Sequence, residues 1–105
     1  MKVRVTLTAA FRERARTKQL LEELPEGSKL KDLIARLALR YGGVFNEVVD
    51  QSGSLNPDLL LLVNGLSVSD LDYELKDGDE VMLGLSIVGG KLRAVQNDDL
   101  RFKKL

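Results

Sequence analysis

A single amphipathic helix pattern, over residues 28–41, constrains the fold of this chain more than any other feature. Its apolar residues recur at helical spacing and form one continuous face: Leu30, Leu33, Ile34, Leu37, Ala38 and Tyr41. Ser28 is placed to act as the N-cap, because a serine hydroxyl oxygen can accept a backbone N–H of the first turn. Gly42-Gly43 supplies a left-handed C-terminal cap. This helix must bury its apolar face against another element. The rest of the sequence favours strands, so we expect the helix to pack on a sheet.

Strand patterns lie on both sides of this helix. Apolar and polar residues alternate over residues 2–8 and again over residues 80–88, which predicts a half-buried strand in each segment. The continuous apolar run over residues 59–63 predicts a central strand buried on both faces, and Asn64-Gly65 after it predicts a hairpin turn. Residues 18–24 predict a further strand, although their Leu, Glu and Gln content also suits a helix.

The remaining segments have the composition of connections. Residues 12–18 are polar and charged, residues 25–27 and 76–79 are predicted turns, and residues 44–57 are predicted to be irregular. The order of elements predicts an α+β domain with a mixed four- to five-stranded sheet and one main helix packed on one face. Pairing the first and last strands in the middle of that sheet gives the ubiquitin-like β-grasp arrangement.

Composition excludes several classes of chemistry. The chain of 105 residues has room for one domain, and it contains neither cysteine nor histidine. Disulfides, the usual zinc sites and thiol or imidazole catalysis are therefore excluded. Sixteen basic and sixteen acidic residues cancel, so the strongly basic character of a typical nucleic-acid-binding protein is missing. The longest apolar run is far shorter than the roughly 20 residues that cross a bilayer, and residues 1–5 do not resemble a signal peptide. We therefore expect a cytoplasmic protein without metal, nucleic-acid or membrane partners.

The net charge of zero is the sum of two segments of opposite charge, which meet after residue 90. Residues 1–90 contain eleven basic and fourteen acidic side chains, for a net charge of −3. Residues 91–105 contain five basic and two acidic side chains, for a net charge of +3. The boundary falls directly after Gly89-Gly90. We therefore expect a domain over residues 1–90 and a basic C-terminal extension over residues 91–105.

Five short motifs occur in order along residues 1–90. They are Ala-Ala-Phe-Arg-Glu at 9–13, Leu-Pro-Glu-Gly-Ser at 24–28, Leu-Val-Asn-Gly at 62–65, Leu-Lys-Asp-Gly-Asp-Glu-Val at 75–81 and Val-Gly-Gly at 88–90. In this order and spacing they resemble the MoaD/ThiS family of ubiquitin-like (β-grasp) sulfur carriers. The resemblance is closer to MoaD, the small subunit of molybdopterin synthase, than to ThiS.

The chain departs from the family pattern in three places. Residues 85–88 lack the two prolines that often precede the diglycine, and a glycine common in the first hairpin is replaced within residues 14–17. Family members usually end at the diglycine, but fifteen residues follow Gly90 here. Either a processing protease removes residues 91–105, or this extension folds back over the diglycine, or it binds a partner.

The resemblance implies a carrier protein without catalytic residues of its own. In this family an E1-like adenylating enzyme of the MoeB/ThiF type uses ATP to activate the carboxylate of the last glycine, and a sulfur donor then converts it to a thiocarboxylate. The implied site in this chain is Gly90, after cleavage, together with Gly89. Glycine suits this role, because a backbone without side chains can enter a narrow channel. The implied acceptor is the large subunit of molybdopterin synthase or another sulfur acceptor enzyme, for molybdenum- or tungsten-cofactor synthesis. No cofactor is expected on the chain itself.

Three other functions fit the same motifs. A ubiquitin-like protein modifier would join the activated diglycine to lysines of target proteins. A carrier for thiamine or another pathway would deliver its sulfur to a different acceptor, and a β-grasp interaction module would transfer nothing. Because the partner chooses the acceptor, the sequence leaves these alternatives open.

Candidate partner-binding residues lie on the strands near the diglycine. We expect an apolar contact surface on the sheet, made from the following residues: Leu62, Met82, Leu85, Ile87 and Val88. Strand alternation alone does not say which face of the sheet each side chain occupies. Only a structure can therefore establish which of these residues share one face of the sheet.

Two charged groups have simple structural interpretations. Residues 77–80 are predicted to form a polar turn and not a cation site, because they lack the spaced ligands of a calcium loop. Arg12, Arg14 and Arg16 are predicted to lie in a solvated loop, with a basic docking patch as the alternative.

Overall fold

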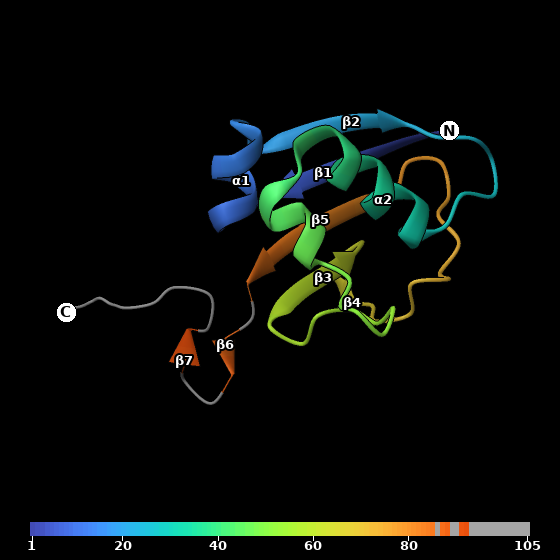
Figure 1. The fold of residues 1–105 in the computed structure, drawn as a ribbon. Helices are drawn as coiled ribbons and strands as arrows, with labels where there is room; N and C mark the ends of the chain where they lie inside the picture. Colours follow the sequence, from blue (N-terminus) through green and yellow to red (C-terminus); the bar gives the residue numbers. More distant parts are fainter. Residues whose placement is uncertain (86, 89–90, 93–105) are drawn as a thin grey trace.

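The chain folds around one mixed sheet of five strands in the order β2-β1-β5-β3-β4 (Figure 1). The computed structural model describes residues 1–85, 87–88 and 91–92, with side chains described through residue 85. The strands of the sheet are β1 (Lys2–Leu7), β2 (Gln19–Glu23), β3 (Leu59–Val63), β4 (Leu66–Ser67) and β5 (Glu80–Leu85). The longest helix, α2 (Leu30–Tyr41), packs across one face. This is the predicted α+β, ubiquitin-like β-grasp architecture.

The first strand and the last strand of the sheet pair in its middle, as the sequence predicted. β1 and β5 run parallel, with Val5 opposite Val81 and Leu7 opposite Leu83. β2 flanks β1 and β3 flanks β5, both in antiparallel pairing. Parallel neighbours cannot be joined by a tight turn, so the segment between them has to cross over the sheet, and α2 lies in that crossover.

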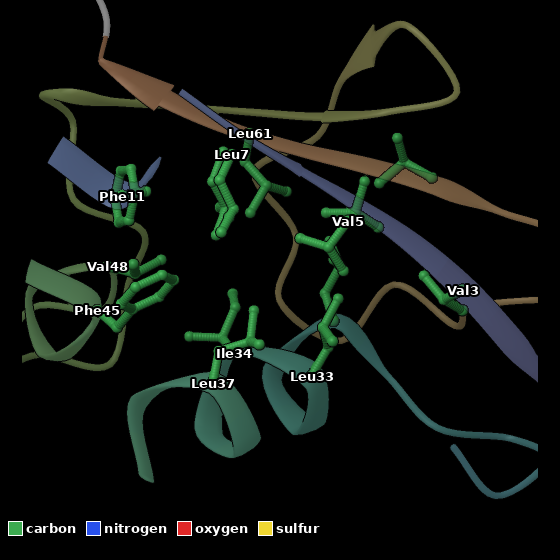
Figure 2. Close-up of a cluster of buried hydrophobic side chains, with 14 of the residues drawn as sticks. Val3, Val5, Leu7, Phe11, Leu33, Ile34, Leu37, Phe45, Val48 and Leu61 are labelled. Carbon is green, nitrogen blue, oxygen red and sulfur yellow. The ribbon is translucent and has the colours of Figure 1, made fainter. Parts of the chain in front are cut away.

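The core lies between the sheet and α2 (Figure 2). Val3, Val5 and Leu7 of β1 are fully buried on the face that meets Leu33 and Leu37 of α2. The alternation in the first strand and the apolar face of the helix are therefore confirmed as the two halves of one core. One end of the core contains a buried aromatic pair, Phe11 and Phe45. Their rings lie 5.2 Å apart in an edge-to-face arrangement.

β3 differs from its prediction as a strand buried on both faces. Leu59, Leu61 and Val63 are buried, but Leu60 and Leu62 between them are only half-buried. The prediction was wrong because α2 covers a single face of this sheet, so every second side chain of β3 points away from the core. The Asn64-Gly65 hairpin is confirmed: both residues have positive φ, 51° and 83°, as the turn between β3 and β4 requires.

The start of α2 also differs from its prediction. The helix begins at Leu30 with Lys29 as its N-cap, because the Ser28 hydroxyl donates a hydrogen bond to the Pro25 carbonyl (2.7 Å) and does not cap the helix. The carboxylate of Asp32 accepts the Lys29 backbone N–H instead (2.8 Å), which stabilises the first turn. At the other end Gly42 ends the helix with a positive φ of 62°, as expected of a glycine cap, but its ψ of −153° differs from the left-handed helical conformation that was predicted.

Two short helical segments occupy regions that were predicted as connections. The first is α1 (Ala9–Ala15), and the second is a 3₁₀ helix, η1 (Gly43–Glu47). Each places one buried aromatic ring in the core, Phe11 and Phe45 respectively. Residues 12–18 are therefore not a simple loop, and residues 44–57 are only partly irregular. Neither segment is long enough to show a helical period, so the tertiary contact of the two rings decides their structure.

The predicted strand over residues 80–88 is wrong after Leu85. β5 ends there, and Ile87–Val88 form a separate strand, β6, paired antiparallel with β7 (Lys91–Leu92). The sheet offers β5 no further neighbours, since β1 ends at Leu7 and β3 begins opposite Leu85. The apolar alternation continues in the sequence, but the backbone pairing changes. Within the described part of the chain, no helix is long and apolar enough to cross a membrane.

Candidate functional site

The face of the sheet opposite α2 carries a small apolar surface formed by three side chains of two neighbouring strands. They are Leu60 and Leu62 of β3 and Met82 of β5. Leu62 lies directly opposite Met82 in the strand register, and all three side chains are half-buried. Because their strand neighbours point into the core, these side chains point away from it. We call these three residues the open-face patch.

The structure brings together two of the predicted partner-binding residues and separates a third. Leu62 and Met82 belong to the open-face patch, whereas Leu85 lies on the opposite face and packs against the core next to Leu59. The backbones of Ile87 and Val88 lie in β6, and their side chains are outside the described part of the chain. Gly89 and Gly90 are also outside the described residues. Sequence reasoning missed Leu60, which only the one-sided covering of the sheet reveals.

A buried glycine, Gly84, lies beside the open-face patch. Gly84 of β5 lies opposite Leu60, and the Thr8 hydroxyl donates a hydrogen bond to the neighbouring Leu83 carbonyl (3.1 Å). A Cβ atom on residue 84 would lie 2.7 Å from the Thr8 hydroxyl oxygen. Glycine is therefore required here by the close approach of a side chain and not by a turn.

Gly84→Ala is expected to lower the free energy of unfolding by about 1 kcal/mol, because the added methyl group displaces Thr8 and breaks its hydrogen bond. Urea denaturation followed by circular dichroism measures the change. The matched background is Thr8→Ala, in which the same substitution should cost much less. An equal loss of stability in both backgrounds would contradict the contact between residues 8 and 84.

Polar side chains at the start of β5 are used in structural hydrogen bonds. The Asp79 carboxylate accepts the Lys76 backbone N–H (2.8 Å) and the Asn64 side-chain amide (2.9 Å). Asp77 accepts the Lys2 backbone N–H (2.7 Å), and Glu80 pairs with Arg4 (2.9 Å). The predicted turn at residues 76–79 is confirmed, with Gly78 at φ 87°. In the described part of the chain, no group of three or more acidic side chains is arranged to hold a metal ion.

The three predicted loop arginines lie on and directly after α1. Arg12 and Arg14 are helical, and Arg16 has a left-handed backbone (φ 61°) that ends the helix. All three side chains are exposed. Arg14 donates a hydrogen bond to the Tyr41 carbonyl at the end of α2 (2.9 Å), so it connects the two helices. The solvated-loop prediction is therefore wrong about the backbone, although the side chains are solvated.

A model of the ThiS family matches residues 5–90 of the sequence. This chain belongs to the ThiS family. The matched region ends at the second glycine of the diglycine, so the extension over residues 91–105 lies outside the family match. This family consists of ubiquitin-like sulfur carriers and modifiers, which are generally non-catalytic proteins that work with E1-like adenylating enzymes and sulfur acceptors.

Solved structures support the placement of this ThiS-family protein. A putative molybdopterin converting factor, subunit 1, from Pyrococcus furiosus is 39% identical, with a TM-score of 0.64 over 79% of this chain and 94% of that chain. The small archaeal modifier protein 1 from Methanosarcina acetivorans is 26% identical, with a TM-score of 0.69 over 85% and 96%. The Haloferax volcanii HVO 2177 protein shares the fold at 24% identity, with a TM-score of 0.75 over 86% and 87%. No curated protein matches the sequence significantly.

Proposed function

We propose that this protein is a sulfur carrier for molybdopterin synthesis, and hence for molybdenum or tungsten cofactors. The observation that carries the proposal is its 39% identity to a protein described as a molybdopterin converting factor subunit, over nearly all of that protein. The family match ends at Gly90, and this supports Gly90 as the reactive residue, because a C-terminal diglycine is the group that this function needs. ATP-dependent activation by a partner enzyme is consistent with a cytoplasmic location.

The proposed chemistry takes place at the carboxylate of Gly90. The carboxylate oxygen attacks the α-phosphorus of ATP on the adenylating enzyme, pyrophosphate leaves, and an acyl-adenylate forms. Sulfide (HS⁻) delivered by a donor then attacks the acyl carbon, the bond to AMP breaks, and a thiocarboxylate remains. The chain contributes a segment without side chains at its last two residues, which allows the reacting carbonyl to enter a narrow site.

The extension has to be removed before this chemistry can begin. In the full chain Gly90 is joined to Lys91 by a peptide bond, so it has no carboxylate. β7 also pairs with β6, so Lys91–Leu92 occupy backbone groups of Ile87–Val88, the segment that leads to the diglycine. We propose that a processing protease cuts after Gly90, which would both create the carboxylate and release β6 from this pairing.

The open-face patch is the proposed contact surface for the adenylating enzyme and for the acceptor subunit. It lies on the neighbouring strands β3 and β5, and the chain continues from the end of β5 to Gly90. Its apolar side chains are half-buried and of the kind that the core of a protein interface contains. Leu85 faces the core and is therefore left out of this surface.

Leu62→Asp is expected to weaken binding to the adenylating enzyme by about tenfold, because a charge would replace an apolar contact at the centre of the interface. Isothermal titration calorimetry with the enzyme encoded in the same genome measures the affinity. Leu66→Asp is the matched control, since Leu66 is exposed on β4 and lies outside the patch. Equal losses for the two variants would contradict the proposed surface.

A ubiquitin-like protein modifier is the second candidate function. It is favoured by the 26% identity to a protein described as a small archaeal modifier. Mass spectrometry of cellular proteins would separate the two: diglycine remnants of this chain on lysines indicate modification. Thiocarboxylate consumption by a large synthase subunit indicates molybdopterin synthesis, and consumption by a thiazole synthase indicates the thiamine pathway. A β-grasp module that transfers nothing would give none of these products.

A further inference from the structure

An apolar groove lies between α2 and the segment that follows this helix in the chain. Five apolar side chains line it, and we call these five residues the α2 groove: Ile34, Ala35, Ala38, Phe45 and Val49. We propose that residues 100–105 of the C-terminal extension bind in the α2 groove of the same chain. This inference goes beyond the proposed function, because it concerns the full chain before cleavage and holds for any sulfur acceptor.

The α2 groove has the size and the surface to hold apolar side chains. Its volume is about 450 Å³, within the range of roughly 300–1,000 Å³ that is usual for ligand-binding clefts. Ala35, Ala38 and Val49 are at least partly exposed, so an apolar occupant would remove them from water. The apolar surface continues along the helix, because Leu39, one turn after Ala35, is 92% exposed.

The charge beside the groove favours a basic occupant. Residues 43–58, which form one side of it, contain three acidic side chains and no basic one, for a net charge of −3: Glu47, Asp50 and Asp58. On the other side α2 carries three basic side chains, of which two form ion pairs: Lys31 with Asp72 and Arg40 with Glu22. The third, Arg36, lies beside a neighbouring hollow and does not line the groove. A peptide with both apolar and basic side chains therefore suits this site.

Residues 100–105 of the extension have this composition. Their sequence is Leu-Arg-Phe-Lys-Lys-Leu. In an extended chain, successive side chains point to opposite sides, so Leu100 and Phe102 would share one side and Arg101 and Lys103 the other. The apolar side can then enter the α2 groove while the basic side faces the acidic segment next to it.

The α2 groove is connected to the end of β5 by short steps. Val48, next to Val49, accepts the Asn56 backbone N–H through its carbonyl (2.9 Å). The Asn56 carbonyl in turn accepts the Leu59 backbone N–H (3.0 Å), and Leu59 lies opposite Leu85 in the strand register. Because each step joins Cα atoms less than about 7 Å apart, the groove lies within roughly 20 Å of Leu85.

The pairing of β6 with β7 brings the extension back toward the same place. Leu92 lies opposite Ile87, which is two residues after Leu85. Leu92 is therefore within roughly 12 Å of Leu85, and no more than roughly 32 Å from the groove. Phe102 follows Leu92 by ten residues, which span about 35 Å when extended. A segment of the same chain within reach has a local concentration on the order of millimolar, so it occupies the groove ahead of a separate molecule.

A second acidic region competes for the basic segment on charge alone. Residues 70–80 contain six acidic side chains and one basic one, for a net charge of −5. Much of this charge lies at the start of β5, where Glu80 is paired with Arg4 and Asp77 accepts the Lys2 backbone N–H. Six strand residues place that end roughly 20 Å from Leu85. Leu100 and Phe102 therefore favour the α2 groove, which combines an apolar lining with negative charge.

Paramagnetic NMR of the full chain tests the proposal. The chain contains no cysteine, so Lys104→Cys supplies a single attachment site for a nitroxide label. We expect the label to remove most of the intensity of the amide signals of Ala38 and Asn46, which line the groove, and little of that of Gly78. Gly78 is the distant reference, because its backbone N–H binds the Lys2 carbonyl at the start of β1.

Two variants of the labelled chain provide the specificity test. Phe102→Asp should restore the groove signals, because a charge replaces the apolar side chain that enters the groove. Val95→Asp is the matched control with the same net charge, and it should leave the loss of intensity unchanged. Both substitutions lie in the extension, outside the domain over residues 1–85, so the folded core is unchanged in both.

Several outcomes would overturn the proposal. These are groove signals of full intensity in the labelled chain, restoration by Val95→Asp as complete as by Phe102→Asp, and loss of intensity at Gly78 instead of the groove. The loss must also occur within one molecule: an equal loss when a labelled chain without ¹⁵N is mixed with an unlabelled ¹⁵N chain would replace the extension of the same chain with a second copy. The proposed function is judged separately, because thiocarboxylate formation by a chain that ends at Gly90 does not involve residues 100–105.

Discussion

A chain that ends at Gly90 is expected to form a C-terminal thiocarboxylate, and the chain that ends at Leu105 is expected to form none. The difference is all or none, because adenylation needs a free carboxylate and Gly90 of the longer chain is part of a peptide bond. Both chains are incubated with the adenylating enzyme, ATP and a sulfur donor. Intact-mass spectrometry then detects the replacement of one oxygen atom by sulfur.

Two further measurements complete this experiment. A chain that ends at Lys91 is the matched control, since it has a free carboxylate but places a charged side chain beside it. It should react far more slowly than the chain that ends at Gly90. Conversion of the Leu105 chain without any shortening would contradict the prediction. In the native cell we expect the species that ends at Gly90, and finding only the full-length species would argue against maturation.

Arg40→Met is expected to lower the free energy of unfolding by about 3 kcal/mol, because it leaves a buried carboxylate without its partner. Glu22 of β2 is only 4% exposed, and Arg40 of α2 donates two hydrogen bonds to it, 2.5 Å and 2.9 Å long. These bonds also raise the pKa of the Arg40 guanidinium above its usual value. Because the Arg40 side chain is 42% exposed, water can partly replace it, which keeps the expected loss at the lower end of the range for buried pairs.

Urea denaturation of four chains tests this prediction as a double-mutant cycle: the wild type, Arg40→Met, Glu22→Met and the double variant. The double variant should regain much of the stability lost in Arg40→Met, since it no longer contains a buried unpaired charge. Arg4→Met is the matched control, because its pair with Glu80 is half-exposed on both sides and should contribute less than about 1 kcal/mol. A loss of unfolding free energy in Arg40→Met no larger than that in Arg4→Met would contradict the prediction, because the pair of Arg40 and Glu22 would then contribute no more than an exposed pair.

The regular patterns of the sequence predicted the sheet and its helix correctly. The alternation at Val3, Val5 and Leu7 identifies a strand with one buried face, and the apolar face of residues 30–41 identifies the helix that covers it. Local turn chemistry was equally reliable at Asn64-Gly65 and at Gly42, where positive φ is needed. These features are readable because each depends only on near neighbours in the chain.

The errors came where distant contacts decide the structure. α1 is too short to have a period, and it forms around the packing of Phe11 against Phe45. The apolar alternation runs on past Leu85, but β5 ends there because its neighbours end. The predicted contact residues could not be assigned to a face, and the structure separates Leu85 from Leu62 and Met82. In each case the deciding partner lies far away in the sequence.

The sequence by itself therefore determined the class of fold and the family resemblance, and it predicts the boundary at Gly90, because short-range periodicity, turn residues and motif order can be read from it directly. Only the tertiary structure decided which face of the sheet is open and that Glu22 is buried against Arg40. It also placed α1 beside the end of β5. Those three properties depend on which strand lies next to which, and strand order is fixed by the packing of the whole chain around one core.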